Sequence, residues 1–99
     1  MDDDLNGWPV GLVGESHYQD AIARCAPGQG VALIPEPNNP ADPRAIMVWS
    51  EEGEQIGYVP RDCWVTAAML DEGDKLHAVI ASMHGARPMR AIVLDVFHQ

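Results

Sequence analysis

No apolar run in this chain is long, and turn-forming residues separate most of the runs. Six runs are rich in β-branched and aromatic residues or alternate apolar and polar residues, which predicts short strands. The expected strands cover residues 8–14, 31–34, 45–49, 55–59, 76–83 and 90–97. In the last strand Ile92, Leu94 and Val96 would share one face, as a half-buried strand requires.

Two short helices are expected between these strands. Ser16 stands three residues before Gln19, a capping-box pattern that predicts the start of the first helix. The apolar stripe of this helix recurs at helical spacing and consists of Tyr18, Ala21, Ile22 and Cys25. Pro60 predicts the start of a second helix of about ten residues, since proline fits the first turn. The expected inner face of the second helix consists of Trp64, Ala67 and Ala68.

A chain of 99 residues fits a single domain. We expect a flexible acidic leader over residues 1–7 and one mainly β domain with two short helices over residues 8–99. Six short strands favour a small closed or nearly closed barrel, because closure removes exposed strand edges. Tryptophan is usually largely buried, so Trp8 and Trp49 are both expected in the core.

The net charge of −9 limits the kind of partner that the chain can bind. Proteins that coat a duplex by neutralising many phosphates are usually basic, so we do not expect this mode of binding. Recognition through a small local site stays open. The sequence has no apolar run long enough for a membrane span, and its acidic start is unlike a signal peptide, so we expect a cytoplasmic protein. Cys25 and Cys63 are then expected to be reduced thiols.

Motifs for catalysis, metal binding and cofactor binding are missing from the sequence. The glycines near the N-terminus match no phosphate-binding fingerprint, and no Gly-x-Ser-x-Gly elbow occurs. The histidines stand far apart, without Cys-x-x-Cys or His-x-x-x-His spacing, and are His17, His77, His84 and His98. We therefore expect a binding protein that is not an enzyme and holds no cofactor and no metal.

Residues 35–44 form an unusual loop with four prolines interleaved with Asn and Asp. Proline fixes φ, and the side chains of Asn39 and Asp42 can bond nearby backbone groups, so the loop would be ordered before a ligand arrives. Such a loop loses little entropy on binding, which suits recognition. The alternative is that Asn39 and Asp42 only satisfy backbone donors at a corner of the barrel.

Three blocks of this sequence resemble the HIRAN domain family. They are Gly14-Glu15-Ser16-His17-Tyr18-Gln19, Val31-x-Leu33-x-x-Glu36-Pro37-x-Asn39-Pro40-x-Asp42-Pro43-x-Ala45-Ile46-x-Val48 and Gly53-x-x-Ile56-Gly57-Tyr58-Val59-Pro60. The resemblance covers roughly residues 10–70 and implies an OB-like six-stranded antiparallel β-barrel, here as a free-standing member of bacterial type. Its best-known members belong to fork-remodelling DNA translocases, where the domain holds the 3′ end of single-stranded DNA, which implies a role in DNA repair.

The resemblance also implies a binding site. Asp42 and Asn39 match the loop positions that hold the terminal 3′ hydroxyl and the backbone beside it. His17 and Tyr18 match the start of the first helix, which faces the end nucleotides. Tyr58 matches a polar ring position on the strand after the hairpin.

Two basic residues and two departures complete the implied site. Arg44 and Arg61 flank it and are expected to contact phosphates, with ordinary surface pairing to acidic neighbours as the alternative. Ala41 stands where the DNA-binding member has a tyrosine, and Ser16 where it has an arginine. Each stacking platform is worth about 1–3 kcal/mol per base, so DNA binding by the isolated chain is expected to be weak.

Our leading hypothesis is a nucleic-acid-binding module that recognises a single-stranded DNA 3′-hydroxyl end and has no catalytic step of its own. The rival hypothesis is a protein-interaction or adaptor domain that has lost DNA binding, motivated by Ala41, Ser16 and the acidic charge. In either case a helicase or nuclease is a candidate protein partner. A hidden hydrolase is the remaining alternative.

Overall fold

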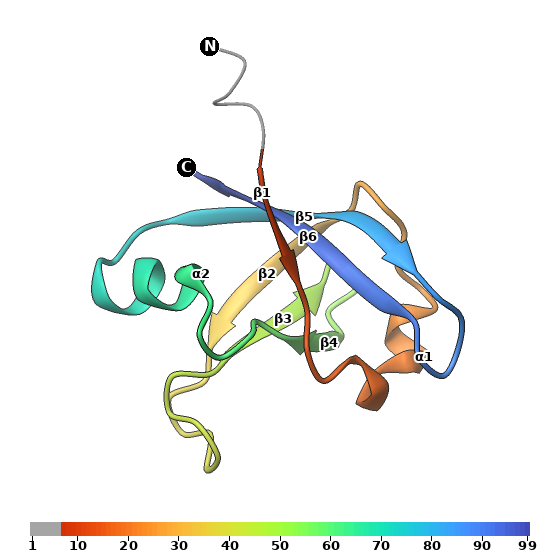
Figure 1. The fold of residues 1–99 in the computed structure, drawn as a ribbon, viewed down its shortest axis with the longest axis horizontal. Helices are drawn as coiled ribbons and strands as arrows, with labels where there is room; N and C mark the ends of the chain where they lie inside the picture. The colour runs from red at the N-terminus through yellow and green to blue at the C-terminus, as the bar shows by residue number, and fades with distance from the viewer. Residues whose placement is uncertain (1–6) are drawn as a thin grey trace.

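The computed structural model describes residues 7–99, so the expected leader lies outside the described part except for Gly7. Six strands and two short helical segments follow one another along this part of the chain (Figure 1). The strands are β1 (Trp8–Gly11), β2 (Gly30–Pro35), β3 (Ile46–Ser50), β4 (Gln55–Tyr58), β5 (Leu76–His84) and β6 (Ala91–His98). The helical segments are η2 (Glu15–His17) followed by α1 (Gln19–Ile22), and α2 (Trp64–Thr66) followed by the π-helical η3 (Ala67–Asp71).

All six strands pair antiparallel in one sheet, in the order β1-β6-β5-β2-β3-β4. The sheet curls on itself (Figure 1), and its two edges meet just beyond β1, where Val13 and Tyr58 form an antiparallel bridge. Each of these residues donates its backbone N–H to the carbonyl of the other at 2.9 Å. The curled six-stranded sheet with two short helices confirms the predicted mainly β, OB-like fold.

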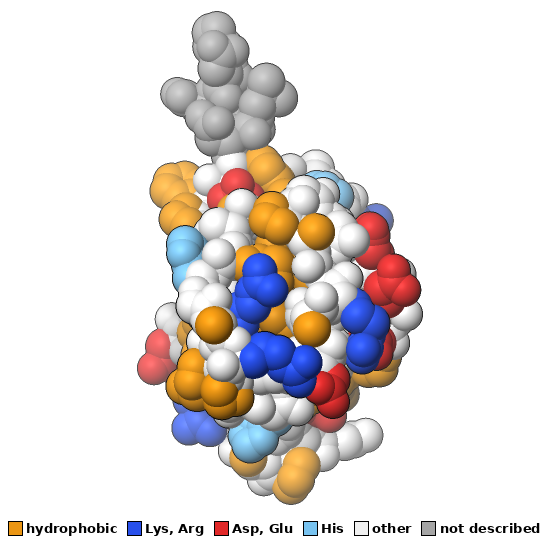
Figure 2. Space-filling model, turned by 90° about the vertical axis from the view of Figure 1, so that its right-hand side faces the viewer, with side chains coloured by type: hydrophobic (Ala, Val, Ile, Leu, Met, Phe, Trp, Pro, Cys, Tyr) orange, Lys and Arg blue, Asp and Glu red, His pale blue; other side chains and the backbone are white. Residues whose placement is uncertain are grey.

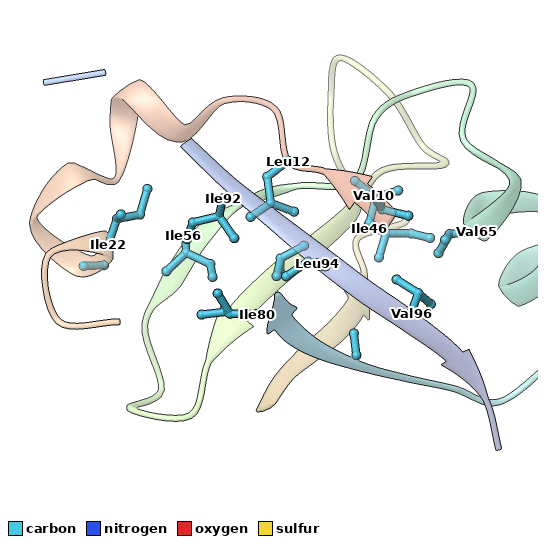
Figure 3. Packing of buried hydrophobic residues seen from close by; sticks show 14 residues of the cluster. Val10, Leu12, Ile22, Ile46, Ile56, Val65, Ile80, Ile92, Leu94 and Val96 are labelled. Atoms are coloured by element: carbon cyan, nitrogen blue, oxygen red, sulfur yellow. The ribbon is translucent and has the colours of Figure 1, made fainter. Parts of the chain in front are cut away.

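The core fills the inside of this curled sheet (Figure 3). β6 shows the predicted alternation, because Ile92, Leu94 and Val96 are buried while the residues between them are only half-buried. Ile22 from α1 and Val65 from α2 are fully buried and join the same cluster. Each short helix therefore contributes a side chain to the core inside the curled sheet.

The first helix begins later than the capping-box pattern predicted. Ser16 lies inside η2, α1 begins at Gln19, and no side chain caps α1. Gln19 is buried, and its Nε2 donates to the carbonyl oxygens of Glu15 and Arg90, both at 3.0 Å. Its Oε1 accepts the backbone N–H of Arg90 at 3.0 Å. This side chain thus joins α1 to the residue before β6 instead of closing a capping box.

The second helix also begins later than predicted, at Trp64 rather than Pro60. Residues 61–62 form a turn that the Cys63 N–H closes on the carbonyl of Pro60 at 3.2 Å. The helix is rotated relative to the prediction, since Val65 and Ala68 face the core while Trp64 is 38% exposed.

The predicted burial of Trp8 is wrong, because this side chain is 61% exposed. Trp8 lies opposite Val96 in the sheet and so shares the inner face with Val10 and Val96. It belongs to the part of β1 that extends past the packed end of the core. Trp49 is half-buried on β3.

We predict that Gln19→Ala lowers the free energy of unfolding by about 1–3 kcal/mol, because the N–H and carbonyl of Arg90 lose their side-chain partner. Urea unfolding followed by circular dichroism measures this change. Gln99→Ala removes the same side chain at an exposed position and should leave stability unchanged. Equal stability of the two variants would contradict the role given to Gln19.

Candidate nucleic-acid interface

The proline-rich loop between β2 and β3 is held in shape by its own polar groups. The Oδ1 atom of Asn39 accepts the backbone N–H groups of Ala41 at 2.8 Å and Asp42 at 3.0 Å. Oδ1 of Asp42 accepts the N–H of Arg44 at 2.9 Å, and the Ala45 N–H bonds the Asp42 carbonyl at 3.0 Å. Asn39 and Asp42 therefore do satisfy backbone donors, as the structural alternative expected. Of their side-chain oxygens, only Oδ2 of Asp42 is left without a backbone donor, and it lies 3.5 Å from Nε of Arg61.

Glu36 connects this loop to β4. Its Oε1 accepts the hydroxyl of Tyr58 at 2.9 Å and the Nδ2 of Asn39 at 2.8 Å. Glu36 belongs to the second block that resembles the HIRAN family, but the sequence predicts no role for it. The contact that reveals its role joins residues far apart along the chain, so no local pattern could have indicated it.

Tyr18, the residue just before α1, is a neighbour of Tyr58 and Glu36. Burial raises the pKa of the Tyr18 phenol, and the neighbouring Tyr58 and Glu36 raise it further. A phenolate at Tyr18 would be a second negative charge near the Glu36 carboxylate, so its ionisation is disfavoured. The Tyr18 phenol therefore stays protonated at neutral pH and can donate a hydrogen bond.

An open pocket of about 240 Å³ lies between the loop and the sheet-closing bridge. Five of the seven predicted site residues line it: Asn39, Asp42, Arg44, Tyr58 and Arg61. The other lining residues are mainly small or apolar and are Val13, Ala41, Ala45, Val59 and Thr66. Pockets for drug-sized ligands span about 300–1,000 Å³, so this one suits the end of a chain molecule better than a whole nucleotide.

The two arginines of the pocket are both near carboxylates. Arg44 donates two hydrogen bonds to Asp71, at 2.9 and 3.0 Å. This contact raises the pKa of Arg44 and lowers the pKa of Asp71. Nε of Arg61 lies 3.5 Å from Oδ2 of Asp42, while the Arg61 side chain is 70% exposed. Arg44 therefore fits the alternative of ordinary surface pairing with an acidic neighbour, whereas the Arg61 side chain remains largely exposed to solvent.

The remaining predicted residues, His17 and Tyr18, line a second hollow of about 540 Å³ beside α1. The two rings meet edge to face, with centroids 6.4 Å apart. Arg24 and Glu54 also line this hollow and form a bidentate ion pair. Nε and Nη2 of Arg24 donate to Oε1 and Oε2 of Glu54, both at 2.7 Å. On the face that carries α1, Lys and Arg side chains lie near the middle, with acidic side chains beside them and toward the edge (Figure 2). Two arginines of the chain are paired with carboxylates, Arg24 with Glu54 and Arg87 with Asp20.

The described residues give no sign of a different chemistry. Within residues 7–99 no group of His, Cys, Asp and Glu is arranged to hold a metal ion, and no helix there is long and apolar enough to cross a membrane. Cys25 and Cys63 are free thiols and half-buried. Burial raises the pKa of the Cys25 thiol, which makes it a weak nucleophile.

We predict that Tyr58→Phe lowers the pKa of Tyr18 but leaves it above the ordinary value, because burial is the larger cause of the shift. The chain has two tyrosines, so this variant contains Tyr18 alone, and ultraviolet absorbance follows its ionisation directly. The same variant in urea gives the unfolded reference. An unchanged Tyr18 pKa would show that the two phenols do not interact.

Solved structures share this fold. The crystal structure of the HIRAN domain of human HLTF superposes with a TM-score of 0.74 at 23% identity, covering 94% of this chain and 74% of that chain. A crystal structure of a protein from Lactobacillus plantarum gives 0.65 at 25% identity, covering 91% and 92%. The NMR structure of the HLTF HIRAN domain in its DNA-bound conformation gives 0.60 at 21% identity, covering 96% and 81%.

The comparison by sequence leads to the same family. No curated protein matches this chain. The sequence model described as the HIRAN domain, however, matches residues 10–96, which is nearly the whole of the described part. This match agrees with the three blocks of the sequence and with the curled six-stranded sheet. The chain belongs to the HIRAN domain family.

Proposed function

We propose that this chain binds nucleic acid and that its pocket holds the free 3′-hydroxyl end of a single DNA strand. One observation carries the proposal: the loop is held by its own hydrogen bonds and leaves one carboxylate oxygen of Asp42 free of backbone donors. The DNA-bound conformation recorded for the HLTF HIRAN domain supports nucleic acid as the ligand class. The proposed role is binding, without a catalytic step.

Asp42 would discriminate between a hydroxyl and a phosphate. Asp42 lines the pocket; its Oδ1 accepts the Arg44 N–H, while its Oδ2 lies 3.5 Å from Nε of Arg61. An ionised carboxylate accepts a short, strong hydrogen bond from a hydroxyl and repels a phosphate in the same place. The side chain is 23% exposed, so a ligand end can reach it.

Arg61 would supply the charge that the nucleic-acid backbone needs. Its guanidinium is largely exposed at the mouth of the pocket and can turn from Asp42 toward a phosphate. Each phosphate contact on a single strand changes the salt dependence of binding by a slope of about −0.7. One or two such contacts therefore give weak, moderately salt-dependent binding, in keeping with the acidic charge of the chain.

The rings beside the pocket would hold the nucleotides that precede the end. Tyr58 lines the pocket, Tyr18 is its neighbour, and His17 leads into the hollow along α1. Base stacking on such rings is worth about 1–3 kcal/mol per base. Ala41 adds no ring from the loop, so fewer bases can stack here than on a fully aromatic site.

Fluorescence anisotropy of a labelled single strand at low salt, with a 3′ hydroxyl or a 3′ phosphate, tests this proposal. We expect the hydroxyl end to bind at least about tenfold more tightly, because a hydrogen bond to a charged group is worth about 1.5–3 kcal/mol. Asp42→Asn keeps an oxygen for the Arg44 N–H but loses the charge, so this preference should largely disappear. Asp62→Asn makes the same charge change outside the pocket and should keep the preference.

Two results would contradict the proposal. Equal binding of both strand ends would indicate a generic contact rather than end recognition. No binding at about 100 μM protein, the weak limit of non-specific DNA binding, would favour the protein-interaction alternative. The pairing of Arg44 with Asp71 and the net charge of −9 are the observations that favour that alternative.

A further inference from the structure

A third hollow, of about 340 Å³, is lined by three aromatic side chains and shares no residue with the proposed DNA site. Its lining residues are Trp8 from β1, Trp64 from α2 and His98 from β6. Figure 1 shows the start of β1 and the end of β6 together at one end of the molecule, while the loop before β3 lies at the other end. We call this hollow the aromatic groove.

The strand register explains why the aromatic groove is apolar and yet open. Trp8 pairs with Val96, and His98 follows Val96 by two residues, so all three side chains point to the inner face of the sheet. Val96 is buried, whereas Trp8 is 61% exposed. The inner face therefore continues beyond the packed core, and nothing else in residues 7–99 closes over it. Two such accessible tryptophans in one hollow are unusual for a monomer.

The walls of the aromatic groove are held in place before any ligand binds. The rings of Trp64 and His98 stack with centroids 5.8 Å apart and planes at 29°. The same imidazole also contacts a carboxylate, because Nε2 of His98 lies 3.4 Å from Oδ2 of Asp74. His98 is thus positioned between a ring and a carboxylate, which limits the entropy lost when a ligand enters.

We propose that the aromatic groove binds the cationic side chain of an arginine or lysine from a basic segment of a partner protein. A cation is attracted to the face of an indole ring, and tryptophan is the best of the aromatic residues for this contact. The carboxylate of Asp74 lies beside His98, and Glu72 belongs to the same turn. Asp71, just before this turn, is already paired with Arg44. The only basic residue in this turn is Lys75, which is exposed and does not line the groove.

The charge of the chain selects among the possible occupants. A net charge of −9 attracts a basic segment over a long range and repels an acidic one or a phosphate backbone. A second copy of this chain would bring another −9, so self-association through this end is disfavoured. An entirely apolar segment would gain nothing from the acidic turn. This inference does not depend on DNA binding, because the two sites share no residue.

The test uses the full chain and a short fluorescein-labelled peptide of alternating arginine and glycine. The matched peptide carries citrulline, an uncharged side chain of nearly the same shape. We expect the arginine peptide to bind and the citrulline peptide to bind at least about tenfold more weakly. Equal binding of the two peptides would overturn the proposal, since an apolar groove alone would then explain the affinity.

Variants separate the rings from the general acidic charge. Trp8→Leu and Trp64→Leu keep apolar side chains but remove an indole, and each should weaken arginine-peptide binding by about 2- to 30-fold. Asp74→Asn should also weaken it, while Glu51→Gln, the same charge change in the β3–β4 turn, should not. Urea unfolding confirms that each variant is folded. Unchanged binding by both tryptophan variants would overturn the proposal and leave only a diffuse attraction between charges.

Two further results would decide against a cationic partner. Sedimentation that shows a dimer of the native chain and a monomer of Trp8→Leu would assign the aromatic groove to a second copy. Weaker arginine-peptide binding by Asp42→Asn, with unchanged binding by the tryptophan variants, would place the peptide in the pocket beside Asp42 instead. We expect a monomer, and we expect Trp8→Leu to bind DNA as the native chain does.

Discussion

Two reciprocal backbone hydrogen bonds between Val13 and Tyr58 join the edges of the sheet. Gly57 makes this approach possible, because a Cβ there would lie 2.9 Å from the carbonyl oxygen of Val13. Closure brings the end of β4 beside the segment after β1, and both residues of the bridge line the pocket. The pocket therefore lies where the barrel closes, and any change that separates the two edges of the sheet also removes part of the pocket wall.

Side-chain hydrogen bonds to Glu36 connect β4, one of the two edge strands of the sheet, to the proline-rich loop. One carboxylate oxygen accepts from the Tyr58 hydroxyl and from the Asn39 amide, so the rigid loop is anchored on the strand that closes the barrel. A buried or half-buried network of this kind holds its members in one arrangement when all are satisfied. The free oxygen of Asp42 is then presented at a defined position rather than on a mobile loop.

Local patterns predicted the strands well and the helix starts poorly. A period of two placed the buried residues of β6 correctly, because a strand flanked by neighbours on a curved sheet has one inner face. The Ser16–Gln19 interval predicted a cap, but Gln19 bonds the backbone of Arg90, a partner that no local rule contains. Trp8 was assigned to the core by its residue type, although its burial depends on where the core ends.

The sequence by itself determined the six strands, the ordered proline-rich loop and, through the resemblance of its blocks, the residues at the pocket. These features depend on neighbours in the chain or on contiguous motifs. Tertiary structure alone decided the role of Glu36, the separation of His17 from the pocket and the exposed aromatic groove. Each of these depends on how far the sheet curls and where its edges meet, and curvature is a property of the whole sheet that no short segment encodes.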